Sequence, residues 1–243
     1  MLMSSDADST AGNQVLAALP SSDYALLAPH LREMSLTRGA VLHYHGQHIA
    51  HVYFPQGGMV SIVVAMRDGT MVETATLGRA NIVGASAAFG SNLAVGMAVV
   101  QLPGKASRIR AEQLRAAAQE SAVIRDSAAR HNDLLFAQVQ QSVACNALHG
   151  LEQRLCRWLL RAHDCGDGDT VPLTQEFLGE MLGVRRTSVT LAAQLLQTKG
   201  IISYRRGQIR IANRSALEGL ACECYETIQS LSQKALQALV KQP

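Results

Sequence analysis

A chain of 243 residues is long enough for one large domain or two modest ones, and 48% hydrophobic with 17% charged residues is ordinary for a soluble globular protein. The first apolar run, Val15 to Leu19, is far too short for a signal sequence or a membrane span. We therefore expect a cytoplasmic protein with no membrane partner. The five cysteines are odd in number and form no C-x-x-C pair, which favours reduced, mostly buried thiols over a disulfide scaffold.

The sequence pattern of the first half of the chain is typical of a small β domain. Residues 1–12 read as a frayed terminus, and a short amphipathic helix is expected to follow, to about residue 33. From Leu36 to about Ile109, short apolar runs are broken by glycines at regular spacing, which predicts an antiparallel β-barrel or β-roll. RDGT, residues 67–70, is the clearest hairpin turn, because Asp-Gly tolerates the positive φ that such turns require.

HYHGQHIAH, residues 43–51, holds four of the eight histidines. Gly46 is expected at the bend of a hairpin, with His43 and His45 two apart on a strand and so on one face. These two, with His48 folding back, are weak candidates for a metal site, because no carboxylate or cysteine is near to complete it. A solvent-facing turn rich in histidine is the favoured interpretation, and a metal- or haem-binding sensor that acts through protein contacts is the alternative.

After Pro103-Gly104 the pattern becomes helical for some sixty residues. Between Ser121 and Leu148 an apolar stripe recurs at three- or four-residue steps and consists of Ile124, Ala128, His131, Leu135, Val139 and Val143. So narrow a stripe on so long a helix favours pairing with a second copy of the chain, and packing against the β domain is the alternative. A further amphipathic helix is expected over 149–164, followed by a loop over 165–172. Asp164, Asp167 and Asp169 are interpreted as a solvated acidic linker.

The segment from Leu173 to Asn213 predicts two short helices and a β-hairpin. Thr174 is a good N-cap for the first helix, whose apolar face is Phe177, Leu178, Met181 and Leu182. Gly179 costs helix stability by about 1 kcal/mol relative to alanine, so its presence suggests that another backbone approaches closely there. Gly183 then supplies a tight turn, as in a helix-turn-helix.

The second helix starts at RRTSVT and carries polar side chains on its outer face. Its inward residues are predicted to be Val189, Ala192, Leu195 and Leu196. IISYRRGQIRI, residues 201–211, predicts a two-stranded wing with Ile209 and Ile211 inward and Gln208 and Arg210 outward. From Arg185 to Arg214 the chain has seven basic residues and no acidic one, although the whole chain carries a formal net charge of only +3. This imbalance is typical of a surface that binds a polyanion.

With these elements in this order, the chain resembles the family of the bacterial catabolite activator and the fumarate-nitrate regulators, most specifically in TQEFLGEMLGVRRTSVT. The resemblance implies an α+β fold: an N-terminal antiparallel β-roll of the cyclic-nucleotide-binding, jelly-roll type, a long dimerisation helix and a C-terminal winged helix-turn-helix. The implied boundaries are 1–118 for the sensor domain with its N-terminal helix, 119–148 for the dimerisation helix, and 149–243 for the DNA-binding domain with a helical extension.

The resemblance also implies a DNA-binding site. Arg186 matches the family arginine that reads a guanine, whereas Thr187 and Leu191 replace a glutamate and an arginine, so the DNA half-site should differ. The expected DNA-binding residues are Arg185, Arg186, Thr187, Ser188, Thr190, Thr174, Gln175, Arg205 and Arg206. We expect a homodimer that reads a two-fold-symmetric site on double-stranded DNA, together with RNA polymerase if the protein is an activator.

The sensor domain departs from the family pattern for cyclic nucleotides. Gly84 matches the first residue of the Gly-Glu pair that holds the ribose, but Ala85 replaces the glutamate, and Val95-Gly96 replaces the Arg-Ser pair that holds the phosphate. We therefore expect that cyclic AMP is not the effector, because each lost charge-assisted bond weakens binding by about 1.5 to 3 kcal/mol.

No other cofactor or activity is indicated by the sequence. The N-terminal cysteine cluster of the family's oxygen sensors is missing, and Cys222 and Cys224 are expected to be ordinary residues of a helical extension over 214–240. No cofactor is predicted, the effector stays open, and the absence of a P-loop or G-x-S-x-G pattern argues against an enzyme.

Overall fold

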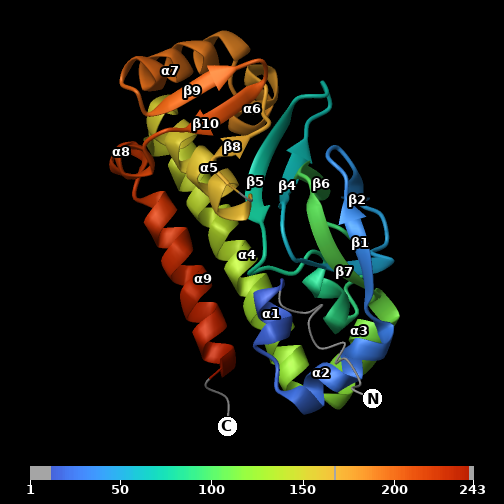
Figure 1. Cartoon of the computed structure of the whole chain (residues 1–243). Helices are drawn as coiled ribbons and strands as arrows, with labels where there is room; N and C mark the ends of the chain where they lie inside the picture. The colour runs from blue at the N-terminus through green and yellow to red at the C-terminus, as the bar shows by residue number, and fades with distance from the viewer. Residues whose placement is uncertain (1–11, 167, 241–243) are drawn as a thin grey trace, which may run out of the picture.

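A computed structural model describes residues 12–166 and 168–240. The β domain fills one side of the molecule, and two long helices, of residues 122–148 and 224–240, run along the opposite side (Figure 1). The two helices and the hairpin of residues 175–211 lie at one end. The predicted frayed terminus, residues 1–12, lies outside the described residues except for Gly12. Within the described ranges, no helix is both long enough and apolar enough to cross a membrane.

The described part of the N-terminal region contains three short helices where a single short amphipathic helix was expected. These are α1 (Gln14–Ala17), α2 (Ser21–Leu27) and the 3-10 helix η2 (Ala28–His30). Asn13 begins α1, since its side chain accepts hydrogen bonds from the backbone N–H groups of Val15 and Leu16. Pro20 then separates α1 from α2.

Two antiparallel sheets form the β-roll. One has the order β1-β7-β3, with β1 (Arg32–Leu36), β7 (Gly104–Arg110) and β3 (His51–Pro55). The other has the order β2-β6-β4-β5, with β2 (Val41–His43), β6 (Met97–Leu102), β4 (Met59–Ala65) and β5 (Met71–Leu77). The predicted turn at 67–70 is confirmed, because Met66 N–H donates to the Thr70 carbonyl at 2.8 Å and Gly69 has a φ of 86°. The expected change to helix after Pro103-Gly104 is wrong, since β7 pairs with both β1 and β3 before α3 begins.

Three helices follow the roll: α3 (Ala111–Glu120), α4 (Ala122–Leu148) and α5 (Leu151–Cys165). Ser121 caps α4 by accepting from the N–H of Ile124, so the predicted long helix begins and ends within one residue of its expected bounds. The start of its apolar stripe is buried in the chain's own core, as the alternative interpretation held, whereas Val143 is 66% exposed. His131 accepts the N–H of Ile82 at Nε2 (3.1 Å), and burial lowers the pKa of His131 to about 4.

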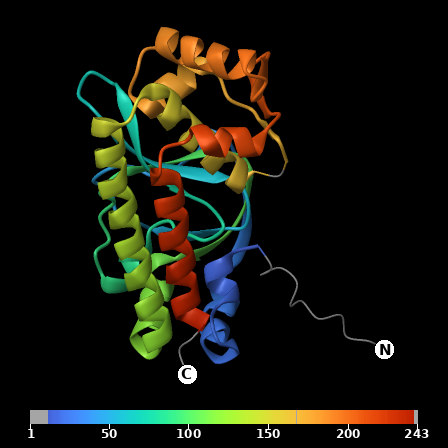
Figure 2. The same cartoon turned by 90° about the vertical axis from the view of Figure 1, so that its left-hand side faces the viewer.

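The C-terminal extension consists of α8 (Arg214–Leu220) and α9 (Cys224–Val240). Figure 2 shows α9 running beside α4 for most of its length, and residues of the two helices are in contact. Residues 221–223 are not helical, so the predicted helical extension is interrupted between the two helices.

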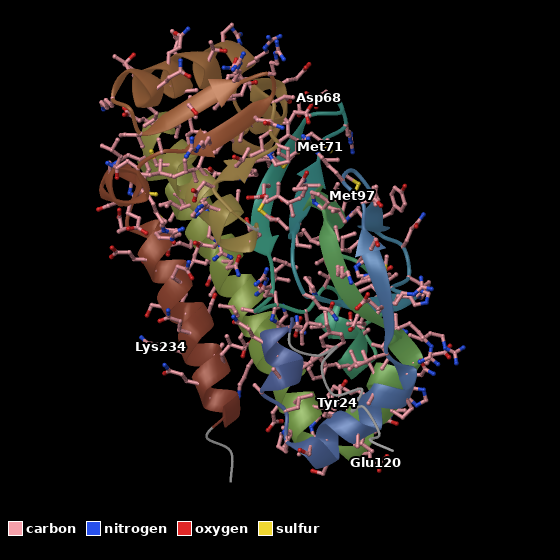
Figure 3. All side chains as sticks on the ribbon, in the orientation of Figure 1. Tyr24, Asp68, Met71, Met97, Glu120 and Lys234 are labelled. Atoms are coloured by element: carbon pink, nitrogen blue, oxygen red, sulfur yellow. The ribbon has the colours of Figure 1, made fainter. Side chains whose placement is uncertain are left out.

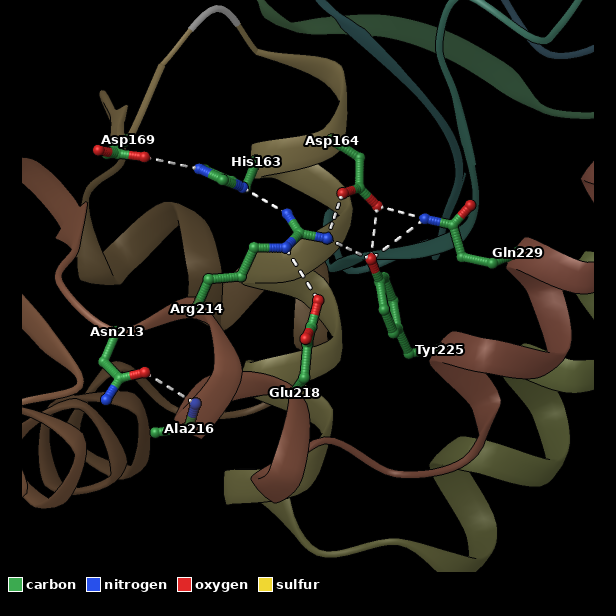
Figure 4. A network of polar contacts seen from close by, with 9 residues as sticks. All are labelled: His163, Asp164, Asp169, Asn213, Arg214, Ala216, Glu218, Tyr225 and Gln229. Atoms are coloured by element: carbon green, nitrogen blue, oxygen red, sulfur yellow. Dashed lines mark hydrogen bonds and ion pairs between the residues drawn. The ribbon is translucent and has the colours of Figure 1, made fainter.

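The Asp164 carboxylate joins α5 to this extension (Figure 4). It accepts hydrogen bonds from Arg214 Nη2 (2.9 Å), the Tyr225 hydroxyl (3.0 Å) and Gln229 Nε2 (2.5 Å). Asp169 pairs with His163 at 3.1 Å, and Asp167 lies outside the described residues. The interpretation of a solvated acidic linker is therefore wrong for Asp164, because its partners come from segments about fifty to sixty-five residues away, which the local sequence does not reveal.

One hydrophobic core is shared between the β-roll and the C-terminal domain. Met59, Val63 and Leu102 of the roll pack with the buried faces of α5 and the helices that follow. Glu73 of β5 is buried beside this core and accepts hydrogen bonds from the hydroxyls of Ser61 and Thr76. Burial raises the pKa of Glu73, while the charges of Arg157 and Arg161 on α5 act in the opposite direction.

Candidate nucleic-acid interface

The first helix of the helix-turn-helix is α6 (Gln175–Leu182). Thr174 caps it as predicted, since its hydroxyl oxygen accepts the N–H of Phe177 at 3.2 Å. Leu178, Met181 and Leu182 are buried, and Phe177 is half-buried with its ring centroid 5.9 Å from that of Trp158. The predicted apolar face therefore packs on α5, which fixes the orientation of α6.

The turn that follows depends on two glycines. Gly183 adopts a left-handed conformation with a φ of 64°, and the N–H of Val184 donates to the carbonyl of Gly179 at 2.9 Å. A Cβ at Gly179 would lie 2.9 Å from the Val184 carbonyl oxygen. The predicted close approach of another backbone at Gly179 is thus confirmed.

The second helix is α7 (Arg186–Thr198), whose Val189, Ala192 and Leu196 are buried as predicted. Leu195 was predicted to face inward but is 53% exposed. The buried face is centred between Ala192 and Ala193, so Leu195 falls on the outer side one turn after Leu191, which is also exposed.

The predicted DNA-contacting residues of α7 lie at its N-terminus. Arg185, Arg186 and Thr187 are exposed, and Ser188 is half-buried. The Thr190 hydroxyl donates to Gln175 Oε1 at 2.7 Å, which ties the two helices together. Gln175 and Thr190 are therefore engaged with each other, while the two arginines and Thr187 point to the outside.

The predicted wing consists of β9 (Ile202–Arg205) and β10 (Gln208–Ile211). Arg206 and Gly207 form its turn with φ values of 50° and 74°, the conformation that two-residue hairpins favour. Ile209 and Ile211 are buried while Gln208 and Arg210 are exposed, as expected. A third strand, β8 (Thr170–Val171), pairs with β10 inside the segment that was predicted to be a loop; two residues are too few to give a periodic signal.

Seven basic residues lie between Arg185 and Arg214, and five of them are exposed arginines of α7, its N-cap and the wing. Lys199 is paired with Glu152 at 3.0 Å, and Arg214 with Asp164 and Glu218 at 2.9 Å each, so these two belong to the protein's own ion pairs. Within the described part of the chain no ion pair involves the other five, which are Arg185, Arg186, Arg205, Arg206 and Arg210. Figure 3 shows side chains that end in nitrogen atoms projecting from the end of the molecule that α7 and the wing form.

A cleft of about 740 Å³ separates the turn of the helix-turn-helix from the β4–β5 hairpin. Arg185 and Arg186 line one side, and Asp68 lies on the other, at the tip of the hairpin (Figure 3). A hydrogen bond from the Thr70 hydroxyl lowers the pKa of Asp68, so its carboxylate is charged at neutral pH. The β-roll thus places an acidic group across the cleft from the basic end of α7.

Of the residues expected in the effector pocket, Gly84 and Ala85 are at the start of the 3-10 helix η3 (Ala85–Phe89), whereas Val95 and Gly96 lie in the loop before β6. Gly84 precedes η3 with a φ of 88°, and a Cβ there would lie 2.7 Å from Cε1 of His43. Ala85 is buried, whereas Val95 is 84% exposed and Gly96 lies against Ile62. The buried imidazole of His43 thus packs against the backbone of Gly84.

The histidine-rich stretch does not form the expected face. Gly46 is at the bend, with a φ of 74°, but β2 ends at His43, so His43 and His45 do not continue one strand. His43 is buried and donates to the carbonyl of His51 at 2.8 Å, and burial lowers its pKa; His45 and His48 are exposed. In the parts of the chain that the structure covers, these histidines do not bring three ligand atoms together. The metal- or haem-sensor alternative is not favoured.

Two family models match the chain, one for each half. Residues 33–121 match the cyclic nucleotide-binding domain, and residues 153–220 match the Crp-like helix-turn-helix domain. No curated protein sequence matches the chain.

Several solved structures are similar in fold. FixK2 from Bradyrhizobium japonicum is 17% identical with a TM-score of 0.67, and the match covers 79% of this chain and 98% of FixK2. A transcriptional regulator of the Crp/Fnr family from Eubacterium rectale is 17% identical with the same TM-score, over 85% and 96% of the two chains. The c-di-GMP-responsive global regulator CLP of Xanthomonas campestris is 14% identical with a TM-score of 0.62, over 79% and 99%.

The β-roll followed by a long helix and a winged helix-turn-helix defines a transcription regulator with a DNA-binding domain. The two matched domains, in this order and over more than half of the chain, are those of the Crp/Fnr family, and the chain belongs to that family. The sequence-based predictions of the fold class and of the family are confirmed.

Proposed function

We propose that the protein is a homodimeric, sequence-specific transcription regulator of the cytoplasm, and that it reads a two-fold-symmetric DNA site through the N-terminus of α7. The observation that carries the proposal is the set of five exposed arginines around α7 and the wing, none of them in an ion pair in the described structure. Such unpaired charges release counterions from DNA on binding, so the affinity should fall steeply with salt.

On the proposed DNA-binding surface, we expect different residues to contact the bases and the phosphates. Arg186 is the first residue of α7 and can bond O6 and N7 of one guanine with its two-pronged guanidinium. The exposed Leu191 and Thr187 offer apolar contact to a thymine methyl group. Arg205 and Arg206 at the wing turn are suited to phosphates, which carry no sequence information.

The dimer is proposed to form through α4. Phe136 and Val143 lie seven residues apart on one face of the helix and are 63% and 66% exposed. Such a face is typical of a helix that pairs with its own copy. Residues 1–118 then act as the sensor domain, 119–148 as the dimerisation helix, and 149–243 as the DNA-binding domain. RNA polymerase becomes a further partner if the protein is an activator.

The effector is proposed to be a ligand other than cyclic AMP, and no catalytic activity is proposed. Ala85 and Val95 carry no charge to hold a ribose or a phosphate, and His43 packs against Gly84. Calorimetry with cyclic AMP should detect no binding tighter than about 10 µM, since that affinity needs nearly 7 kcal/mol. Tighter binding would contradict this part of the proposal.

The DNA-binding surface is tested by replacing its arginines one at a time. Arg186→Ala should weaken binding to the preferred site by about 1 to 3 kcal/mol and relax the sequence at one position of each half-site. Arg206→Ala should weaken binding to all sequences alike and reduce the salt dependence by about one released ion per half-site.

The control is Arg125→Ala, an exposed arginine at the start of α4, away from the DNA-binding domain. It should leave affinity and footprint unchanged. A footprint and an affinity for Arg186→Ala that equal those of the wild type would overturn the assignment of α7 as the recognition helix.

A further inference from the structure

Four side chains with metal-binding atoms meet where α4, α8 and α9 come together. Cys145 is in the last turn of α4 and His149 directly follows this helix, while Cys222 and Cys224 are at the junction of α8 and α9. One potential ligand atom from each of the four lies within 4.8 Å of all the others. The three cysteines are buried and form a small cluster apart from the main hydrophobic cores, and His149 is half-buried.

The backbone explains why residues from distant segments converge. Cys145 is in the last turn of α4, and His149 is the extended residue that caps this helix and donates its backbone N–H to the Cys145 carbonyl at 3.1 Å, which keeps the two residues close together. Helix α8 ends at Leu220, Cys222 lies in the connection, and Cys224 is the first residue of α9. The prediction that Cys222 is an ordinary helix residue is therefore wrong, and the break in the helix lets both thiols face the end of α4.

The distances fit a tetrahedral zinc site. The Sγ atoms of Cys145 and Cys222 are 3.5 Å apart, and Sγ of Cys224 is 3.5 Å from Nδ1 of His149. With Zn–S and Zn–N bonds of about 2.3 and 2.05 Å, a tetrahedral ion separates two sulfurs by about 3.8 Å, and a sulfur from a nitrogen by about 3.6 Å. Shifts of a few tenths of an ångström would complete the geometry.

The surrounding groups suit a bound cation as well. His149 Nε2 is 3.1 Å from Oε2 of Glu223, which leaves Nδ1 facing the cysteines. A carboxylate behind a histidine ligand in this way fixes the ring and its tautomer. Gln141 Nε2 donates to the Cys224 sulfur at 3.0 Å, and Arg154 and Arg157 lie near enough to Cys145 to interact with its charge. The two arginine charges offset the net charge of −1 of a zinc ion bound by three thiolates and a neutral imidazole.

We propose that Cys145, His149, Cys222 and Cys224 bind one structural Zn²⁺ ion. Thiolate and imidazole ligands select zinc over the oxygen-seeking Ca²⁺ and Mg²⁺, and four protein ligands leave no open position for catalysis. The ion clamps the C-terminal helix and the start of the DNA-binding domain to the end of the long helix α4. The site is independent of the proposed DNA-binding surface and of the histidines at 43–51.

The zinc content of the full-length protein, purified under reducing conditions, tests the site. Elemental analysis should find about one zinc per chain. Cys145→Ala and Cys222→Ala should each lose most of it, whereas Cys156→Ala, which removes a fully buried thiol of α5, should retain it. Equal loss in the Cys156→Ala control would overturn the assignment of the ligands.

A second measurement does not depend on the folding of a variant. Wild-type protein is stripped of metal and titrated with Co²⁺ alone. The expected result is one equivalent bound, with the visible bands of tetrahedral cobalt and the near-ultraviolet bands of cobalt–thiolate bonds. Wild-type protein that holds less than about a tenth of an equivalent of either metal, or that contains a Cys145–Cys222 disulfide under reducing conditions, would overturn the proposal.

Discussion

At the scale of single residues, the helix-turn-helix depends on a glycine, because the turn leaves no room for a Cβ at position 179. Gly179 lies in the middle of α6, where alanine would have the higher helix propensity. Its place is explained by the carbonyl of Val184, which approaches to 2.9 Å of the position a Cβ would take. The sequence pattern was sufficient to predict this contact, because a glycine inside a short helix lowers its stability and is favoured only where a Cβ has no room.

The first prediction concerns this contact. Gly179→Ala should lower the free energy of unfolding by about 1 to 2 kcal/mol, because the overpacking outweighs the gain in helix propensity. The control is Gly219→Ala in α8, where a Cβ meets nothing within 4 Å and no positive φ is involved. That variant should be stabilised by up to about 1 kcal/mol. Urea unfolding measures both, and a stabilised Gly179→Ala would contradict the close approach.

Other residues could not be placed from the sequence. His43 belongs to a stretch that looks solvent-facing, yet its ring is buried and bonded to the carbonyl of His51, the partner across the bend. Asp164 looks like part of an acidic loop but accepts three hydrogen bonds, all from α8 and α9. In both cases the partner is set by tertiary packing, which local patterns do not encode.

At the scale of elements, α4 is the helix whose bounds were predicted best, and different parts of it are buried in the chain's own core and exposed on the surface. Its bounds were predicted from the apolar period, the structure shows Ser121 as its N-cap, and its first turns pack on the β-roll. Farther along, α9 lies against α4, and Phe136 and Val143 stay exposed on another face. The sequence predicted one apolar stripe for self-pairing, but the folded helix buries one part of it in the chain's own core.

The second prediction addresses the exposed face of α4. Val143→Glu should weaken self-association on the order of 100-fold, because pairing would bury unpaired charges at a symmetric contact. Val95→Glu is the matched control, since Val95 is 84% exposed on the loop before β6. Sedimentation velocity at micromolar concentration should find a monomer for the first variant and a dimer for the second. A dimeric Val143→Glu would place the interface elsewhere.

Short elements were the least predictable. Strand β8 has two residues, and α1, α2 and η2 together replaced one expected helix. Elements of this length are held by pairing with distant strands or by single caps such as Asn13, so they leave no periodic trace in the sequence. The wing and the hairpin at 67–70 were predictable because Arg-Gly and Asp-Gly mark their turns.

At the scale of the whole molecule, the domain order could be predicted, while the contact between domains could not. The roll and the DNA-binding domain share a core through Met59, Val63 and Leu102. At the turn of the helix-turn-helix, a Cβ at Gly183 would lie 3.4 Å from the Val72 side chain of the β4–β5 hairpin. Asp68 faces the cleft beside Arg185 and Arg186. These contacts give the β-roll a direct physical connection to the helix-turn-helix.

The selection of binding sites from a pool of random DNA duplexes tests the central claim most directly. The enriched sequence should be a palindrome whose half-sites are centred about one helical turn, roughly 10 base pairs, apart, with a guanine at a fixed place in each half. Retention of the pool should fall as salt rises. A pool with no enriched sequence, or an enriched sequence without two-fold symmetry, would contradict a dimeric regulator that reads DNA through α7.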